Sequence, residues 1–377
     1  MKEQELKMYK RYFLTSESVT EGHPDKVCDF ISDSILDACL EQDKESRVAV
    51  ETLICKNKVV VAGQITSNAT IDIESIVREK LKEVDYTDEN INMDYRTCLV
   101  DINITKQSND IAMGVDVGGA GDQGIMYGYA TDESEDYMPT PISIAHKLSK
   151  RLAEVRKNGQ IPYLKSDGKV QVTVEYWDDI PMRIDTIVIS TQHSADTDIP
   201  TLQRDLIEKV VIEVVELDMI DADTKFYINP TGRFVIGGAV ADTGLTGRKI
   251  IVDTYGGISK HGGGAFSGKD GTKVDRSASY MLRHIAKNVV ANGLASKCEI
   301  QMSYGIGIKE PLSIYIDCFG TNRVSEGKIK RIIKSTFDLT PNGIINYLKL
   351  KEPIYSKTSN YGHFGREGFT WEEFRQI

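Results

Sequence analysis

The first sustained pattern in the chain is that of an amphipathic helix that starts close to residue 25. Apolar residues recur at helical spacing from Val27 to Ala38, and Asp29, Asp33 and Asp37 lie on another face of the same helix. Residues 14–25, before this helix, show no sustained alternation and are predicted to form a loop. The segment therefore indicates a loop that leads into a helix with one apolar and one acidic face.

The remaining patterns predict mixed units of helices and strands. Strands are predicted at residues 47–55, 58–65, 98–104, 169–177, 183–191, 225–228, 250–255, 299–306 and 312–318. Helices are predicted at residues 72–83, 141–157, 201–217, 277–292 and 326–337. Mixed alternation of this kind is typical of α+β layers. Residue identity reveals no clear internal repeat, although three successive units share a similar order of elements.

Two glycine-rich stretches interrupt these patterns and divide the chain. The first runs from Asn109 to Gly128 and is too long for an ordinary turn, so we interpret it as a mobile loop at a domain boundary. Glycine becomes frequent again from Thr231 onward. These boundaries predict an N-terminal domain over residues 11–110, a flexible loop over 111–124, a central domain over 125–235 and a C-terminal domain over 236–377.

Composition mainly changes the expected kind of binding partner. With 40% hydrophobic and 27% charged residues in a chain of 377, there are enough apolar side chains for a full core, which excludes a disordered or collagen-like protein. The net charge of −10, from 46 Lys and Arg against 56 Asp and Glu, argues against a surface that coats nucleic acid or anionic membranes. Any anionic ligand must therefore be bound by a local group of cations.

Neither the N-terminus nor the cysteines suggest export. The first ten residues are charged, and no apolar run reaches secretory or membrane-spanning length, so we expect a soluble cytoplasmic protein that contacts no membrane. The six cysteines form no CxxC motif and do not pair with histidine at metal-ligand spacing. We expect all six to be reduced.

Two glycine motifs match nucleotide-binding patterns by letter but not by context. Residues 119–124 (GAGDQG) fit the dinucleotide pattern GxGxxG, yet no predicted strand runs directly into them, as a Rossmann fold requires. Residues 263–270 (GGAFSGKD) differ from a Walker A motif because Asp270 replaces the Mg²⁺-binding hydroxyl, and the preceding predicted strand ends too early. Both folds are disfavoured, although a glycine loop with a lysine can cradle phosphate in another geometry.

The segment from Arg233 to Arg283 is the most informative part of the charge distribution. It holds eight basic residues against four acidic ones, in a chain that is acidic as a whole, and eleven glycines as well. A solvated basic face would explain the charges, but not the many backbone N–H groups left without side-chain cover. Cations combined with open backbone donors favour a polyphosphate-binding site.

A short polar motif, residues 23–26 (HPDK), stands directly before the first predicted helix, so the helix N-terminus could face an anion. A plain capping sequence would explain the motif equally well. His-Pro-Asp also occurs in the J-domains of co-chaperones, but those are short basic helical bundles, unlike this acidic chain. Asp25 and Asp275 each lie beside a cation, as Mg²⁺–phosphate sites require, but spacing alone does not establish that they meet.

Five motifs make the chain resemble the S-adenosylmethionine synthetases (methionine adenosyltransferases), from about Phe13 to about Trp371. The motifs are residues 15–26 (TSESVTEGHPDK), 119–124 (GAGDQG), 229–238 (NPTGRFVIGG), 242–249 (DTGLTGRK) and 261–270 (HGGGAFSGKD). The resemblance implies three similar α+β domains around a pseudo-threefold axis. It also implies a homodimer with active sites shared between the subunits, often paired into a homotetramer, with no role for nucleic acid or membrane.

The implied reaction converts ATP, L-methionine and water into S-adenosylmethionine, phosphate and diphosphate. The methionine sulfur attacks C5′ of ATP and displaces the whole tripolyphosphate, which is then cleaved before release. A thioether has no proton to remove, so this chemistry needs no general base or catalytic triad, and the sequence reveals none. Its difficulty is the charge on the leaving tripolyphosphate, which converging cations must stabilise.

The resemblance also implies roles for residues at matching motif positions. Catalytic contacts to the phosphates are implied for His23, Lys169, Arg248 and Lys269, joined by Lys249. The rest of the ATP site is implied to be Asp167, Arg233, Phe234, Asp242 and Ala265, with Arg233 and Phe234 at the adenine and Asp242 at the ribose. Methionine is implied to contact Gln64, Gln107, Asp122 and Lys273. Asp25 and Asp275 are implied to hold two Mg²⁺ ions per site, and Glu51 one K⁺ per subunit.

Two departures from the family pattern concern methionine. Gln64 stands where the family usually has a glutamate facing the methionine ammonium, and its amide keeps an acceptor but loses the charge, so we expect weaker methionine binding or altered tolerance of analogues. The gating loop between Gln107 and Asp122 is shorter than in many relatives, which would change product release. Two alternatives stay open: a tripolyphosphatase or transferase that uses another thioether, and a non-catalytic ATP-binding subunit, although the complete phosphate and metal set argues against the second.

Overall fold

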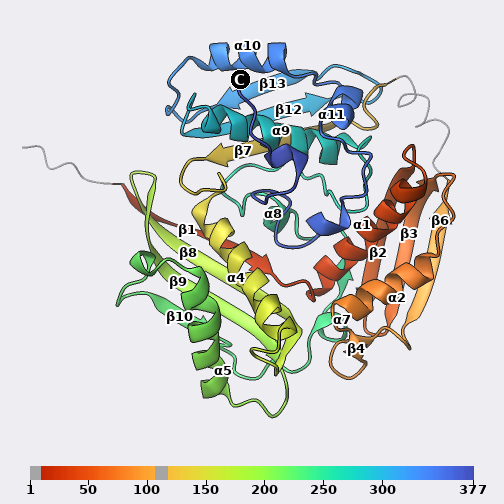
Figure 1. Ribbon diagram of the computed structural model, residues 1–377, viewed down its shortest axis with the longest axis vertical. Helices are drawn as coiled ribbons and strands as arrows, with labels where there is room; N and C mark the ends of the chain where they lie inside the picture. The colour runs from red at the N-terminus through yellow and green to blue at the C-terminus, as the bar shows by residue number, and fades with distance from the viewer. Residues whose placement is uncertain (1–9, 107–117) are drawn as a thin grey trace, which may run out of the picture.

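The computed structural model describes residues 10–106 and 118–377, and every statement about its elements refers to these residues. It contains three layers in which helices pack on β-sheets, and this confirms the predicted α+β class (Figure 1). Helices long and apolar enough to cross a membrane are absent from the described ranges. All six cysteines are free, as expected from their spacing.

The first layer is a four-stranded sheet covered by two helices. Its strand order is β11–β2–β3–β6, with β2 antiparallel to β3 and β3 parallel to β6. Alternate residues of β2, including Val48, Val50 and Ile54, are buried in the core, whereas the residues between them are more exposed. The elements are α1 (Pro24–Gln42), β2 (Arg47–Cys55), β3 (Lys58–Thr66), α2 (Ile73–Glu83), the short pair β4 (Thr87–Asp88) and β5 (Met93–Asp94), β6 (Leu99–Thr105) and β11 (Gly244–Leu245).

The second layer is a four-stranded sheet whose order is β1–β8–β9–β10, with α4 packed on β1 and β8. Its first three strands are antiparallel, and β10 runs parallel to β9. The helix predicted at residues 201–217 is divided, because a π-helical turn (Ile207–Val211) separates α5 from α6. The elements are β1 (Arg11–Val19), α4 (Thr140–Lys157), β8 (Leu164–Trp177), β9 (Ile180–His193), α5 (Ile199–Leu206), α6 (Ile212–Val214) and β10 (Lys225–Ile228).

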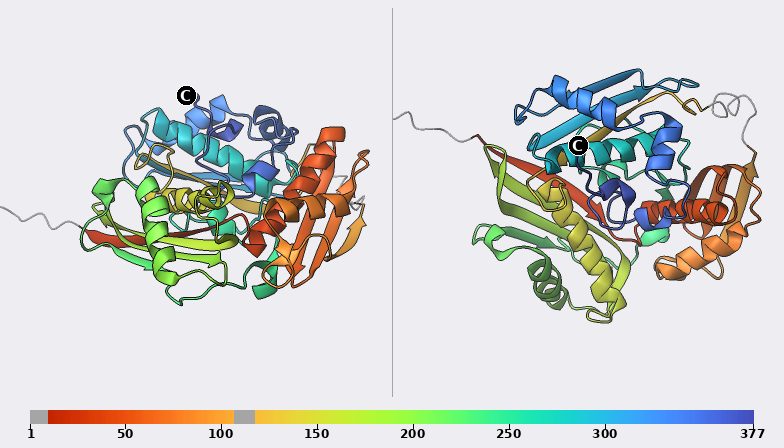
Figure 2. Two further views of the ribbon diagram at one scale, coloured as in Figure 1. Left: turned by 60° about the horizontal axis from the view of Figure 1, so that its bottom comes forward. Right: turned by 45° about the horizontal axis from the view of Figure 1, so that its top comes forward.

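The third layer is a three-stranded antiparallel sheet of order β13–β12–β7, with α9 on one face. The three layers lie around a common centre, and the C-terminal segment lies among them (Figures 1 and 2). The elements are β7 (Gly124–Thr131), α9 (Val274–Ala291), β12 (Lys297–Tyr304), β13 (Ser313–Asp317), α10 (Glu326–Thr336) and α11 (Pro341–Tyr347), with two short helices, α7 (Gly238–Ala241) and α8 (Ile250–Asp253), in the connection before α9.

Each of the three layer sheets takes one strand from a distant part of the chain. β1 joins the second sheet, β11 joins the first, and β7 joins the third. The pairing is extensive for β1, all nine residues of which are in register with β8, and for β7, all eight residues of which pair with β12. The contiguous domains 11–110, 125–235 and 236–377 therefore stay a prediction, since each of the three layer sheets crosses one of these boundaries.

The loop predicted over residues 14–25 is wrong, because most of this segment forms β1 and the start of α1. Its small polar residues hide the strand pattern in the sequence. Ser16 and Ser18 are buried, and their hydroxyls bond to the Gly256 carbonyl and to His146 Nδ1, both at 2.8 Å. Polar residues can thus line a buried strand face when distant segments supply their partners.

The strand predicted over residues 250–255 is also wrong, because residues 250–253 form the single helical turn α8. The run of β-branched residues suggested a strand, but tertiary contacts decide the outcome. The carboxylate of Asp253, the last residue of α8, pairs with buried Lys26, and the chain then leaves through Gly256 and Gly257 at φ values of +65° and +89°.

Neither glycine motif belongs to the nucleotide-binding fold whose pattern it matches, the Rossmann fold or the P-loop fold, as predicted. GAGDQG leads into a strand, β7, where a Rossmann motif would lead into a helix. Residues 263–270 are preceded by the helical turn α8, where a P-loop would need a strand.

Candidate functional site

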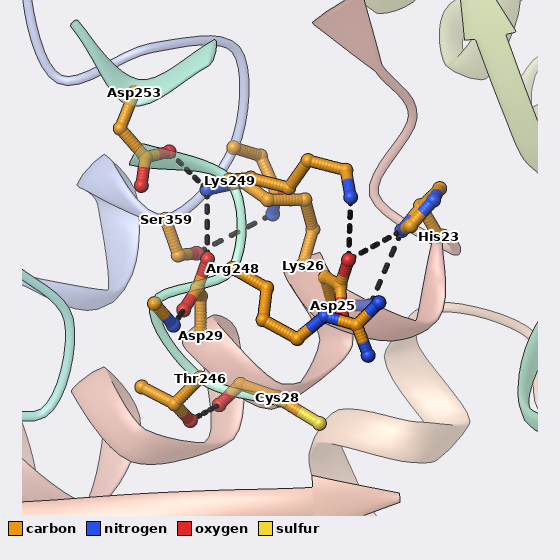
Figure 3. A network of polar contacts seen from close by, with 12 residues as sticks. His23, Asp25, Lys26, Cys28, Asp29, Thr246, Arg248, Lys249, Asp253 and Ser359 are labelled. Atoms are coloured by element: carbon orange, nitrogen blue, oxygen red, sulfur yellow. Dashed lines mark hydrogen bonds and ion pairs between the residues drawn. The ribbon is translucent and has the colours of Figure 1, made fainter. Parts of the chain in front are cut away.

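The start of α1 brings two predicted site residues together. Pro24 occupies the first turn, where a missing N–H is no loss, and His23 caps the helix by accepting the Asp25 N–H at Nδ1 (3.2 Å). The same ring atom lies 4.0 Å from the Asp25 carboxylate. The two polar side chains thus share one helix end, as Figure 3 shows.

The loop after β11 places two cations at this helix end. The Leu245 N–H donates to Asp25 Oδ1 (3.0 Å), Arg248 Nε lies 3.5 Å from the same oxygen, and Lys249 Nζ bonds to Oδ2 (Figure 3). The Asp25 side chain is 1% exposed, whereas that of Arg248 is 47% exposed. A buried carboxylate therefore holds cations that can also contact a ligand.

Burial and neighbouring lysines keep the His23 imidazole neutral. Burial of the ring, followed by Lys249 and Lys169, lowers the pKa of His23 to about 4, while Asp25 opposes this change. Because Nδ1 accepts the Asp25 N–H, the hydrogen-bond network assigns the single proton to Nε2. His23 therefore offers a hydrogen-bond donor that carries no charge.

Three more predicted residues surround the same helix end. Asp167 accepts the Gly238 N–H (2.8 Å), and burial raises its pKa to about 6. Lys169 is half-exposed on β8 and pairs with Glu17 of β1 (2.6 Å). Asp242 is close enough to raise the pKa of both Asp167 and His23. The first cluster consists of His23, Asp25, Asp167, Lys169, Asp242, Arg248 and Lys249.

A second cluster lies at the start of α9. Lys269 Nζ is 2.7 Å from Asp275 Oδ2, and these side chains are 26% and 21% exposed. Gly264 passes so close to Asp275 that a Cβ on it would lie 2.3 Å from the carboxylate carbon, so only glycine fits there. Lys273, predicted to bind the methionine carboxylate, is bonded to Asp270. The second cluster consists of Ala265, Lys269, Lys273 and Asp275.

The two clusters are in contact through their loops. A Cβ on Gly247, which precedes Arg248, would lie 2.6 Å from the Ala265 Cβ. Beside the second cluster, Ala49 of β2 forms an isolated bridge with Lys269 and also pairs with Gln64 in β3. Gln64 and Lys269 therefore lie on opposite sides of Ala49. Glu51 follows on the same exposed face of β2.

Other predicted residues are less closely joined to the clusters. The backbone of Phe234 is fixed by two bonds to His193, and in the described ranges no polar contact joins Phe234 or Arg233 to either cluster. Asp122 is exposed and lies two residues before Gly124, on which a Cβ would lie 3.5 Å from Asp275. Gln107 and residues 111–117 of the predicted gating loop lie outside the described residues.

Four aspartates on one face of α1 fix distant segments of the chain, the loops of both clusters among them, a role that the sequence analysis missed. They follow at intervals of four residues, and each accepts backbone N–H groups from a segment more than 200 residues further along the chain. The contacts are Asp25 with Leu245, Asp29 with Gly247, Asp33 with Gly268, and Asp37 with Tyr355 and Ser356. All four are buried. The interval of four was the available signal.

Ion pairs without solvent exposure lie directly behind the clusters. Lys26 is bonded to Asp29 (2.9 Å) and to Asp253, and Arg276 binds Asp33 through both terminal nitrogens (2.6 and 2.9 Å). Burial of the carboxylate and the neighbouring charge of Asp253 raise the pKa of Asp29 to about 7, although Lys26 opposes this rise. These charges hold the start of α1 against α8 (Figure 3), and the middle of α1 against α9.

The carboxylates of the two clusters fit Mg²⁺ that is shared with phosphate. Across residues 10–106 and 118–377, no group of three or more His, Cys, Asp or Glu side chains could enclose a metal ion. Mg²⁺ commonly binds one or two carboxylates and completes its octahedron with water and substrate phosphates. Asp25 and Asp275 suit this arrangement, because each is a carboxylate with lysine beside it at the edge of a cluster.

Comparison with known proteins gives a consistent result over the whole chain. The sequence matches the models of the S-adenosylmethionine synthetase N-terminal domain at residues 11–109, central domain at 117–234 and C-terminal domain at 236–373. It is 54% identical over 378 residues to the S-adenosylmethionine synthase of Desulfosudis oleivorans, covering 98% of this chain and 97% of that protein. It is also 54% identical over 383 residues to that of Clostridium tetani, covering 97% and 98%.

Proposed function

The chain belongs to the S-adenosylmethionine synthetase family, and from this premise we propose that its two clusters bind the substrates of one reaction. ATP, L-methionine and water give S-adenosylmethionine, phosphate and diphosphate. The first cluster carries the proposal, since a capped helix end, a buried carboxylate and two partly open cations converge there. Polyphosphate recognition requires such a convergence.

The chemistry explains why cations are needed and a base is not. The sulfur of methionine forms a bond to C5′ of ATP while the C5′–O bond breaks, and its neutral lone pair needs no deprotonation. The electrons of the broken bond pass to the tripolyphosphate oxygen. Donors placed before the reaction stabilise that developing charge without having to reorganise.

In this proposal His23 donates from Nε2 to the oxygen that leaves C5′. Its lowered pKa supports the role, since a neutral imidazole donates a hydrogen bond without bringing a charge that Lys249 and Lys169 would repel. Arg248 and Lys249, with Lys169 and Lys269, contact the phosphate oxygens. Water then cleaves the tripolyphosphate, which the same cations hold in place.

The remaining roles follow the family pattern. Mg²⁺ held by Asp25 and Asp275 would neutralise phosphate charge, and K⁺ at Glu51 would act without touching substrate. Arg233, Phe234, Asp242, Asp167 and Ala265 complete the ATP site. Methionine is bound by Gln64, Gln107, Asp122 and Lys273. To reach the substrate carboxylate, Lys273 must release its present partner Asp270.

We also propose that a second copy of the chain completes each site, in a homodimer that pairs further into a tetramer. Large apolar side chains are exposed on the sheets, among them Phe13 (49%), Leu99 (66%) and Tyr315 (57%). Lys169 and Glu51 are also exposed strand residues, so a partner that covers the sheets would meet them. Light scattering should give at least twice the chain mass, and a monomer would contradict a shared site.

Mass spectrometry of the products tests the reaction directly. The purified protein is incubated with ATP, Mg²⁺ and K⁺, with and without L-methionine. The expected result is S-adenosylmethionine in equal amount to diphosphate and phosphate, formed only with methionine. Tripolyphosphate cleavage alone, or product formed only with another thioether, would contradict the proposed substrate while leaving the phosphate site intact.

A further inference from the structure

A cavity of about 500 Å³ lies between α4 and the C-terminal segment, and none of its lining residues has a role in the proposed reaction. His146 and Lys147 line it from α4, while Tyr361, Phe364 and Arg366 line it from the segment after α11. Its volume lies within the range of small-molecule sites. It is therefore large enough for a ligand with more than one functional group.

The charge of the cavity is opposite to that of the chain as a whole. Four basic side chains line it, against two carboxylates. One of these, Asp136, already accepts hydrogen bonds from the hydroxyls of Ser134 and Ser143, both at 2.6 Å, and so belongs to the wall. The basic side chains are Lys147, Lys150, Lys357 and Arg366. An anion would find a local excess of positive charge here.

Arg366 is the clearest sign of a missing partner. Its Nε is buried without a hydrogen bond, and no salt bridge joins Arg366 to a carboxylate within residues 10–106 and 118–377. A terminal nitrogen donates to the Lys357 carbonyl (2.8 Å), and the guanidinium lies 5.1 Å from the Phe369 ring centroid. By contrast, the buried arginines Arg276 and Arg283 each bind a carboxylate.

Two further polar atoms around the same cavity lack partners. His146 Nε2 and Tyr361 Oη are buried without a hydrogen bond, and His146 as a whole is 8% exposed. Buried polar groups are normally paired, so these three atoms leave hydrogen-bonding capacity unused in the wall beside the cavity. The rest of the wall is apolar and aromatic, with Met138, Phe364 and Phe369.

We propose that this cavity binds a small organic anion, whose oxyanion group pairs with Arg366 and whose apolar body packs on the phenylalanines. The guanidinium supplies directed donors, and Lys147 and Lys357 add charge at the more exposed end. The site is separate from the catalysed reaction, so it stands or falls independently of the proposed function.

Calorimetric titration of the full-length protein with naphthalene-2-sulfonate tests the proposal. The phosphate clusters are first saturated with a non-hydrolysable ATP analogue and Mg²⁺, without methionine, which would still attack C5′ of the analogue, so that only a separate site is measured. The expected result is one probe bound per chain, with affinity about tenfold weaker in Arg366→Gln, since a charged hydrogen bond is lost. Raising the salt concentration weakens binding as well.

Matched controls distinguish this site from general attraction. Lys334→Gln removes one charge from the exposed surface of α10 and should leave affinity unchanged. If Arg366→Gln fails to fold, Lys147→Gln with Lys357→Gln, both at exposed positions, should still weaken binding. No binding, equal binding of the uncharged naphthalene-2-sulfonamide, or unchanged affinity in the cavity variants would overturn the proposal.

Discussion

Asp25 and Lys26 are neighbours at the start of α1, but their side chains lie in different surroundings. Asp25 points to the edge of the first cluster, where it holds Arg248 and Lys249. Lys26 points inward and is fully buried between Asp29 and Asp253. The start of α9 repeats this division, since Asp275 pairs with partly exposed Lys269, whereas Arg276 is buried against Asp33.

The difference between these regions separates binding from folding at the level of single residues. Ion pairs at the edge can exchange partners for a ligand, because their cations stay open to solvent. Buried pairs cannot exchange partners, because removing one member leaves an uncompensated charge in a low-dielectric interior. Charged residues of the same types therefore bind substrate on one side of a helix and stabilise the fold on the other side.

The strongest test of this division is to remove a buried cation. Lys26→Met leaves Asp29 and Asp253 without their shared partner and should lower the free energy of unfolding by about 3–5 kcal/mol. Urea denaturation measures the loss. The matched control is Lys269→Met at the edge, whose partner Asp275 is partly exposed, and its unfolding free energy should change by no more than about 1 kcal/mol. Equal losses would refute the distinction.

Removing a cation at the edge should instead impair catalysis. Lys269→Ala should lower kcat by about 10²–10³-fold, if Lys269 stabilises charge on the leaving tripolyphosphate. Its stability should stay near that of the original protein, because the Lys269–Asp275 pair is partly exposed. Steady-state kinetics combined with denaturation separates the two effects. A large loss of stability with normal kcat would place Lys269 among the structural charges.

Acid should weaken the buried region through His284. Its imidazole bonds to the Trp371 carbonyl and the Tyr347 hydroxyl, and burial lowers its pKa to about 4. In the unfolded chain the imidazole takes up a proton near pH 6.5, whereas in the folded chain it stays neutral down to about pH 4. The free energy of unfolding therefore decreases as the pH falls from about 6.5 towards 4. Between pH 7.5 and pH 5, protonation of His284 should lower the free energy of unfolding by about 2 kcal/mol. His284→Gln should lose less stability than the original protein over that interval.

The smallest expected effect concerns Gln64, on the exposed face of the first sheet. Gln64→Glu restores a charge for the methionine ammonium and should lower the KM for methionine by about fivefold, equivalent to about 1 kcal/mol. The KM for ATP serves as the internal control and should not change. An unchanged KM for methionine would separate Gln64 from methionine binding.

Local patterns predicted much of the fold, and the failures have a common cause. The strand at residues 47–55 has the bounds of β2, because alternation reports a half-buried strand directly. β1 was missed because its buried residues include serines whose partners, Gly256 and His146, lie far along the chain. α8 was mistaken for a strand because β-branched residues carry no information about an ion pair with Lys26.

The candidate site was predictable in its residues but not in its arrangement. Motifs identified His23, Asp25, Arg248 and Lys249, and the structure places these four together. Their support by the buried face of α1 could not be predicted, because spacing along a helix does not reveal which distant loop covers it. Arg366 was missed for the same reason, since its unpaired state depends on tertiary neighbours.

The strands that the three sheets take from distant parts of the chain, β1, β11 and β7, also determine the order in which the nascent chain can complete these sheets on the ribosome. β1 is made first but stays unpaired until β8 emerges, and the first sheet waits for β11. The second sheet is therefore complete at Ile228, before the first at Leu245, and the third follows at Asp317. Until then, unpaired strand edges are open to wrong partners, so chains cut short during synthesis are candidates for aggregation.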